Sequence, residues 1–145
     1  MKIYRLIAGL FGLLTLASCG LDQLTHDPDL ALTDPDARTA LEEAAEVIMS
    51  RDYEALLEIG YPDPNGGPSI AREPYEDMIA LLPEGQLTAE LFYSERRLAV
   101  VDNEDFIGFL AQFDLASTSG ENTLLEIVVF PFEGECCLVT NVSIT

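Results

Sequence analysis

Between residues 34 and 82, apolar side chains recur at the three- and four-residue spacing of helices that bury one face. A first helix is predicted to begin at Thr33 or Asp34, either of which would cap it, with Pro35 in its first turn. Its buried face would carry Ala37, Leu41, Ala44, Ala45 and Ile48. Residues 50–52 break the pattern, so this helix is expected to end there.

Two shorter helices are predicted after this break, over residues 52–59 and 73–82. Their buried side chains would be Tyr53, Leu56 and Leu57 in the first, and Tyr75, Met78, Ile79 and Leu82 in the second. Residues 60–68 contain three prolines and three glycines, which cannot continue a helix. A loop is therefore predicted between the two short helices.

From residue 86 onward, the pattern changes to the two-residue alternation of β-strands. Residues 87–93 form one alternating segment, and residues 97–101 either continue that strand or begin another. Polar turns separate three further strands, predicted over 106–116, 123–132 and 136–145. In the first of these, one face would carry Ile107, Phe109, Ala111, Phe113 and Leu115. The order predicts an α+β fold, with two to three N-terminal helices packed on a curved, mostly antiparallel sheet of four or more strands.

The N-terminus has the charge and hydropathy pattern of a secretory signal peptide. Lys2 and Arg5 precede an apolar run of 11 residues, whereas a membrane-spanning helix needs about 20. The run ends in Leu16-Ala17-Ser18-Cys19, which resembles the lipobox of bacterial lipoproteins. This resemblance implies cleavage before Cys19, a thioether-linked diacylglycerol on its sulfur and an acylated amino group. The alternative is an ordinary signal peptide with a chance cysteine.

The expected organisation is a cleaved signal peptide (1–18), a lipidated Cys19 with a tether (19–33) and one α+β domain (34–145). Because Gly20 follows the cysteine, where the inner-membrane retention signal of enteric bacteria has Asp, we expect an outer-membrane anchor on the periplasmic side of the envelope. Cleavage would remove Lys2 and Arg5 and leave five arginines against 26 acidic residues, a formal charge of −21. So acidic a chain has no basic surface for nucleic acid, which excludes that class of partner.

Few residues remain for catalysis or for a metal. The single histidine, His26, lies in the tether and is interpreted as solvated. The acidic turn 102–105 has oxygen ligands but lacks the spacing of a calcium loop, so no metal site is expected. Asp114 alternates with the apolar face that carries Phe109 and Phe113, so it is expected to point toward solvent. Glu126 shares a strand face with Leu124 and Val128 and is interpreted as an inward carboxylate, a candidate polar group of a pocket.

Cys136 and Cys137 are adjacent, which restricts how they can pair. Neighbouring residues in a strand point to opposite faces, and their Cα atoms, about 3.8 Å apart, are closer than in most disulfides. Separate thiols are therefore the favoured interpretation. A vicinal disulfide would need a turn-like backbone, such as the turn at 133–135 would provide. Intermolecular bridging and metal capture are the remaining alternatives.

The segment Ser50-Arg51-Asp52-Tyr53-Glu54-Ala55-Leu56-Leu57 resembles the helix break of the nuclear-transport-factor-type (cystatin-like) α+β cone superfamily. Residues 138–144 are similar to the closing hairpin of its small secreted members. The resemblance implies a curved sheet that encloses a conical pocket over residues 35–145. Its members include isomerases, dehydratases and binding or assembly modules, so fold alone does not select a function.

The enzymes of that superfamily pair an Asp with a His or a Tyr for proton transfer, and this chain has its only His in the tether. We therefore expect a lipid-anchored, periplasm-facing, non-catalytic module without a cofactor, which binds a small ligand or a partner protein. One alternative is an envelope assembly subunit that dimerises through its sheet. The other is a cone-type isomerase or dehydratase-like enzyme that uses Glu126 or a tyrosine.

Overall fold

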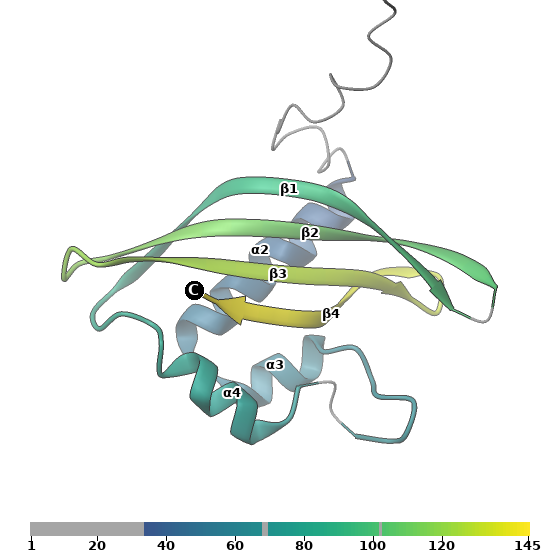
Figure 1. Cartoon of the computed structure of the whole chain (residues 1–145), viewed down its shortest axis with the longest axis horizontal. Coiled ribbons are helices and arrows are strands. Elements are labelled where there is room, and N and C mark those ends of the chain that lie inside the picture. The colour runs from purple at the N-terminus through teal and green to yellow at the C-terminus, as the bar shows by residue number, and fades with distance from the viewer. Residues whose placement is uncertain (1–33, 68–69, 102) are drawn as a thin grey trace, which may run out of the picture.

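The computed structural model describes residues 34–67, 70–101 and 103–145. The predicted signal peptide, Cys19 and the tether with His26 lie outside the described residues. Within these ranges, three helices precede the strands: α2 (Pro35–Ser50), α3 (Tyr53–Ile59) and α4 (Arg72–Ile79). Four strands follow: β1 (Leu87–Val101), β2 (Glu104–Ser117), β3 (Asn122–Phe132) and β4 (Glu135–Ile144). This is an α+β fold, as the sequence predicted (Figure 1).

The beginnings of α2 and α3 are determined by side-chain caps. Of the two predicted caps for the first helix, Asp34 is used: its Oδ1 accepts hydrogen bonds from the backbone N–H of Asp36 at 2.9 Å and of Ala37 at 3.2 Å. The helix ends after Ser50, where Arg51 adopts a left-handed conformation with φ of 59°. Asp52 then caps α3 by accepting from the N–H of Ala55 at 3.2 Å.

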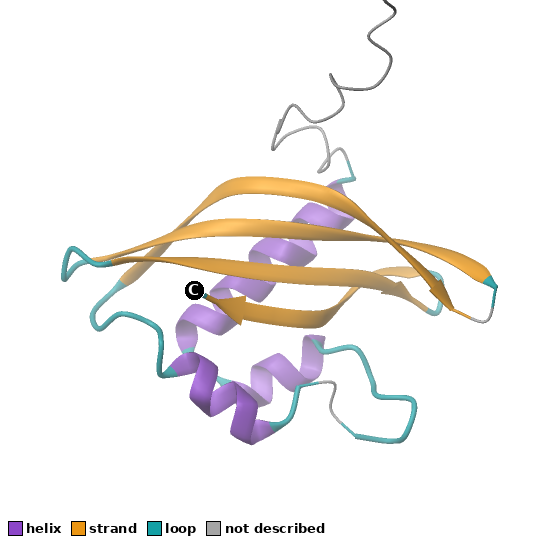
Figure 2. Cartoon of the chain, in the orientation of Figure 1, coloured by secondary structure: helices purple, strands orange, loops and turns teal. Residues whose placement is uncertain are grey.

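The four strands form one open antiparallel sheet in the order β1-β2-β3-β4 (Figure 2). β1 is a single strand of 15 residues, which settles the alternative left open by the sequence. Its pairing with β2 shifts register between Leu91 and Tyr93. The β3–β4 ladder contains two more shifts, one at Thr140 and one where Pro131 lies opposite Cys136 and Cys137. Proline has no N–H to donate to a ladder, so a bulge opposite Pro131 is expected on physical grounds.

The core lies between α2 and one face of the sheet, which we call the helix side (Figure 1). α2 contributes the predicted face, all of it buried: Ala37, Leu41, Ala44, Ala45 and Ile48. The sheet contributes alternate residues of β2 and β3: Phe109, Ala111, Phe113, Leu115, Leu125, Ile127 and Val129. Burial of these side chains is the main source of stability in such a layered fold.

Two predicted core residues are exposed. Leu57 is 38% exposed because the adjacent Leu56 occupies the inward position of the short helix α3. Ile107 is 51% exposed because it pairs with Leu98, itself 68% exposed, near the end of the β1–β2 hairpin, where the helices do not cover the sheet. The third helix is also shorter than predicted, and Leu82 is buried in the segment that follows it. Among the helices that the structure describes, none combines the length and the apolar composition needed to span a bilayer.

Candidate functional site

Glu126 lies on the face of the sheet opposite the helix side. Its neighbours along β3, Leu125 and Ile127, are fully buried on the helix side, so Glu126 points the other way. The Nε2 atom of Gln112 donates to its Oε2 atom at 2.8 Å. The interpretation of Glu126 as an inward carboxylate is therefore wrong, because its side chain faces away from the helix-side core. Both faces of β3 are apolar in sequence, which is why parity could not choose between them.

A second polar group on the sheet is formed within β1. The Tyr93 hydroxyl donates to Oε2 of Glu95 at 2.5 Å, and Oε1 of Glu95 lies 2.9 Å from Nε of Arg97. The pKa of Tyr93 is raised above its ordinary value, first because its phenol donates to the Glu95 carboxylate. In register, Tyr93 lies beside Gln112, which lies beside Glu126. The structure therefore brings Glu126 into a row of polar side chains across a sheet face rather than into an enclosed pocket.

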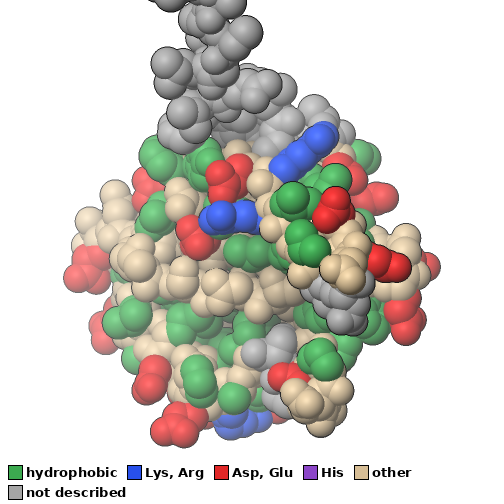
Figure 3. Space-filling model, turned by 45° about the vertical axis from the view of Figure 1, so that its right-hand side comes forward, with side chains coloured by type: hydrophobic (Ala, Val, Ile, Leu, Met, Phe, Trp, Pro, Cys, Tyr) green, Lys and Arg blue, Asp and Glu red, His purple; other side chains and the backbone are tan. Residues whose placement is uncertain are grey.

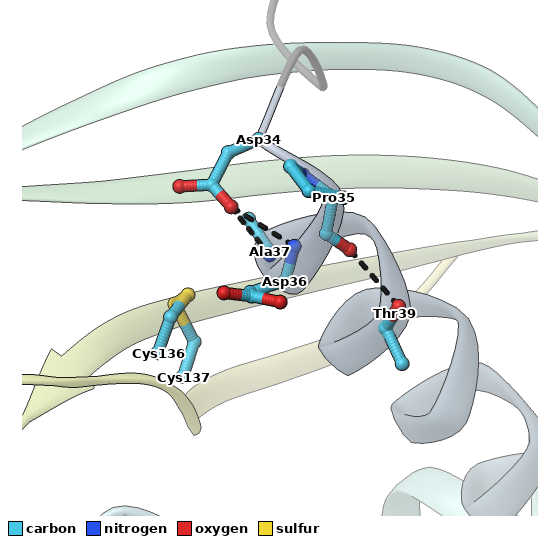
Figure 4. The surroundings of a disulfide bond; sticks show 7 residues. All are labelled: Asp34, Pro35, Asp36, Ala37, Thr39, Cys136 and Cys137. Carbon is cyan, nitrogen blue, oxygen red and sulfur yellow. Dashed lines mark hydrogen bonds between the residues drawn. A yellow bond between two sulfur atoms is a disulfide. The ribbon is translucent and has the colours of Figure 1, made fainter.

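Cys136 and Cys137 are joined by a disulfide in the structure, so the favoured interpretation of separate thiols is wrong and the vicinal alternative is the one observed. Their surroundings, drawn in Figure 4, include the first turn of α2 from Asp34 to Ala37. Both cysteines are partly buried and pack against the helix-side core. They occupy the bulge opposite Pro131, at the start of β4. The bulge interrupts the regular alternation by which neighbouring side chains of a strand point to opposite faces.

An apolar cavity of about 320 Å³ lies where the β1–β2 hairpin, the end of β3 and the loop after α3 meet. Its lining residues are Tyr61, Pro64, Ala99, Phe106, Phe130, Pro131 and Thr140. Ala99 and Phe106 are partners across the β1–β2 ladder, and Pro131 and Thr140 stand at the two bulges of the β3–β4 ladder. Figure 3 brings this end of the molecule forward and shows apolar side chains interspersed with carboxylates over its surface.

Backbone contacts hold the cavity walls in place. The N–H of Tyr61 donates to the carbonyl oxygen of Val139 at 2.7 Å, which attaches the loop to β4. The Tyr61 ring meets the Phe132 ring edge to face, with centroids 5.1 Å apart. Phe130 lies over Gly108 so closely that a Cβ atom on Gly108 would be 2.7 Å from two of its ring carbons. The loop and the aromatic wall are thus positioned before any ligand arrives.

The chemistry that the cavity offers is apolar contact with little hydrogen bonding. None of its lining residues is an acid, an amine or an imidazole. Its polar side-chain groups are the hydroxyls of Tyr61 and Thr140, and the Thr140 hydroxyl already donates to the carbonyl oxygen of Val128 at 3.2 Å. Within the described ranges, no three His, Cys, Asp or Glu side chains come together in a way that could hold a metal ion. Asp102, part of the acidic turn, lies outside them.

The sequence patterns identify none of the seven lining residues individually as part of a site, although Tyr61 and Pro64 lie in the predicted loop 60–68. Two signals in the sequence point to part of this site: Gly108 within an apolar strand, which marks a close approach, and Pro131 within another strand, which marks a bulge. The contact between residue 61 and residues 99–140 depends on long-range packing that local patterns do not encode. Comparison with protein-family models, with curated proteins and with solved structures gives no match.

Proposed function

We propose that this protein is a lipid-anchored, periplasm-facing envelope module that binds a small apolar molecule without catalysing its conversion. The observation that carries the proposal is the cavity of about 320 Å³, which is at the small end of the usual range for ligand sites and is lined mainly by apolar and aromatic side chains. Proton transfer in enzymes is carried out most often by a His, Asp, Glu or Lys side chain, and the cavity lining has none of these; the Tyr61 phenol stands there without an acidic or basic partner in the lining. A non-catalytic role therefore fits this cavity best.

The anchor and the cone belong to the same proposal. The anchor is supported by the charged start, the short apolar run and the sequence Leu16-Ala17-Ser18-Cys19. A cone-like wrapping of the sheet around α2 is supported by the order of elements, with three helices before a four-stranded antiparallel sheet among the described residues. The mass of the N-terminal peptide, measured on protein extracted from the membrane, tests the anchor. An unmodified cysteine, or a chain that still begins at Met1, would refute it.

Native mass spectrometry of residues 19–145 tests ligand binding, with Cys19→Ser so that no acyl chain is attached. We expect an added mass that leaves when the protein is denatured. The variant Ala99→Trp, which fills part of the cavity from β1, should abolish the added mass. Ala89→Trp is the matched control, because Ala89 lies exposed on the same strand outside the cavity lining. An added mass that survives Ala99→Trp would place the ligand elsewhere, and none in any preparation would count against the function.

A second candidate function is envelope assembly through the sheet. Leu98, Val100 and Ile107 are 68%, 63% and 51% exposed at the end of the β1–β2 hairpin, and together they expose apolar surface of the kind found at interfaces. Analytical ultracentrifugation over a concentration series would test this candidate. A dimer that Leu98→Ser dissociates would favour assembly, and a monomer at every concentration would exclude self-association.

A further inference from the structure

The cavity walls are made mostly of rings. Tyr61, Phe106 and Phe130 present aromatic rings, and Pro64 and Pro131 present pyrrolidine rings, so five of the seven lining residues are cyclic. The three aromatic rings are flat and pack against other flat rings through offset or edge-to-face contact, and the two proline rings add stiff apolar surface. A flexible acyl chain gains less from such walls, because it loses its own rotational freedom on binding.

The walls are also fixed in advance by two contacts described above. Gly108 leaves room for the Phe130 ring, and the backbone bond from Tyr61 to Val139 holds the loop against β4. A site with rigid, preformed walls favours a rigid ligand, because neither the protein nor the ligand then loses much conformational entropy on binding. This geometry therefore favours a planar compound over a chain.

Charge narrows the ligand class further. The lining offers no cation to a carboxylate, sulfonate or phosphate, and an unpaired charge is costly to bury in apolar surroundings. The chain as a whole has 26 acidic residues against seven basic ones, so the average field around the protein repels anions. An anionic ligand, including a fatty acid or a phospholipid headgroup, is disfavoured by both observations.

Size and hydrogen bonding complete the description. At the packing density of protein interiors, 320 Å³ accommodates a compound of roughly 15 non-hydrogen atoms. The proton of the Thr140 hydroxyl is engaged with Val128, so this hydroxyl can only accept from a ligand. The Tyr61 hydroxyl is the one lining group left to donate. A ligand therefore needs no more than one or two polar atoms.

We propose that the cavity binds an uncharged, planar compound of two or three aromatic rings, held between Tyr61, Phe106 and Phe130. This inference rests on the proposed function and specifies its ligand class. Affinity for a compound of this size should be micromolar, with Kd of about 1–100 µM.

Fluorescence titration with two matched probes tests the proposal on residues 19–145 carrying Cys19→Ser. N-phenyl-1-naphthylamine is uncharged, and 8-anilinonaphthalene-1-sulfonate has the same rings with one negative charge. We expect saturable binding of the uncharged probe at one site, with the sulfonate at least about tenfold weaker. Ala99→Trp should weaken binding of the uncharged probe by more than tenfold, and Ala89→Trp should leave it unchanged. Equal or tighter binding of the sulfonate would overturn the inference.

Competition with 1-dodecanol, an uncharged chain, separates failure of the ligand class from failure of the function. If dodecanol displaces the probe at lower concentration than naphthalene does, the ligand is a chain and the inference fails, while the proposed function stands. If neither the probe nor dodecanol binds, and native mass spectra show no added mass, the proposed function fails as well. If Ala99→Trp does not unfold cooperatively, Pro64→Ala replaces it, because Pro64 lines the cavity from an exposed loop. The affinity of Pro64→Ala for the uncharged probe should then be about threefold lower. An unchanged affinity would overturn the inference.

Discussion

The contact between Gly108 and Phe130 allows a direct test of how the cavity wall is built. A Cβ atom on Gly108 would lie 2.5 Å from the carbonyl oxygen of Val129 and 2.7 Å from two ring carbons of Phe130. Unstrained contacts between carbon atoms are about 3.5–4.0 Å, so Gly108→Ala must displace the ring, the strand or both. Overpacking of this kind costs about 1–3 kcal/mol, and the loss of glycine's flexibility in the unfolded chain offsets about 0.4–1 kcal/mol of that.

We therefore expect Gly108→Ala to lower the free energy of unfolding by about 1–2 kcal/mol. In urea this corresponds to a lower midpoint by about 0.5–1 M, and in a thermal melt to a loss of about 5–10 °C. Because Phe130 lines the cavity, the Kd of an uncharged aromatic probe should rise in the same variant. Gly67→Ala is the matched control: nothing lies within 4 Å of the added Cβ, so stability should be unchanged or slightly higher.

A double substitution separates the two obstacles. If the Phe130 ring is the main one, Phe130→Leu combined with Gly108→Ala should lose less stability than the sum of the single changes, because the smaller side chain leaves room. Additive losses would assign the cost to the Val129 carbonyl. A Gly108→Ala protein as stable as the wild type, with unchanged probe affinity, would refute the close packing of this wall.

Four further predictions concern the helical layer and the start of β4. Asp34→Ala removes the cap of α2 and should lower the free energy of unfolding in urea by about 1 kcal/mol. Glu43→Gln, on the exposed face of the same helix, should change it by less than about 0.5 kcal/mol. Equal effects of the two substitutions would contradict the capping role of Asp34. The Tyr75 hydroxyl is buried with no hydrogen-bond partner among the described residues, so Tyr75→Phe should raise the free energy of unfolding by about 1 kcal/mol. Tyr53→Phe should lower it by about the same amount, because the Tyr53 hydroxyl donates to the Ile70 carbonyl oxygen at 2.8 Å. Burial raises the pKa of Tyr75 above its ordinary value of 10.0, so the folded state holds the phenol proton more tightly than the unfolded chain does. The free energy of unfolding linked to this proton is fully present below pH 10 and is lost as the pH rises through the raised pKa. Melting temperatures measured against pH should show this loss in the wild type and not in Tyr75→Phe. Alkylation of the unfolded Cys19→Ser protein should label neither Cys136 nor Cys137 without reductant and both after reduction, as read by mass; labelling without reductant would show free thiols.

The helical layer could be predicted from the sequence because its signals are local. Asp34, Pro35 and Asp52 are capping and first-turn residues, and the face of α2 follows from spacing alone. The strands of the sheet could also be placed, since alternation and polar turns mark their limits.

The orientation of β3 could not be predicted, because Leu124 and Val128 on one face are as apolar as Leu125 and Ile127 on the other. Only the packing of α2 determines which face is buried, and Glu126 therefore points away from the helix side. The cavity depends on two bulges and on contacts between residues distant in the chain. Such contacts have no period that a sequence pattern could reveal.

The place where the chain enters the domain has a consequence for how a ligand would reach the cavity. Asp34, the first described residue, lies in the surroundings of Cys136 and Cys137, and these stand opposite Pro131, a residue of the cavity wall. With an anchor at Cys19, the chain up to Asp34 can span at most about 55 Å, whatever its conformation. Asp34 would then stay within that distance of the bilayer, and the attached domain would be held close to the membrane. An uncharged aromatic compound partitions into the bilayer, so the membrane would be a nearby reservoir that resupplies the cavity, while occupancy at equilibrium would still be set by the free concentration in water.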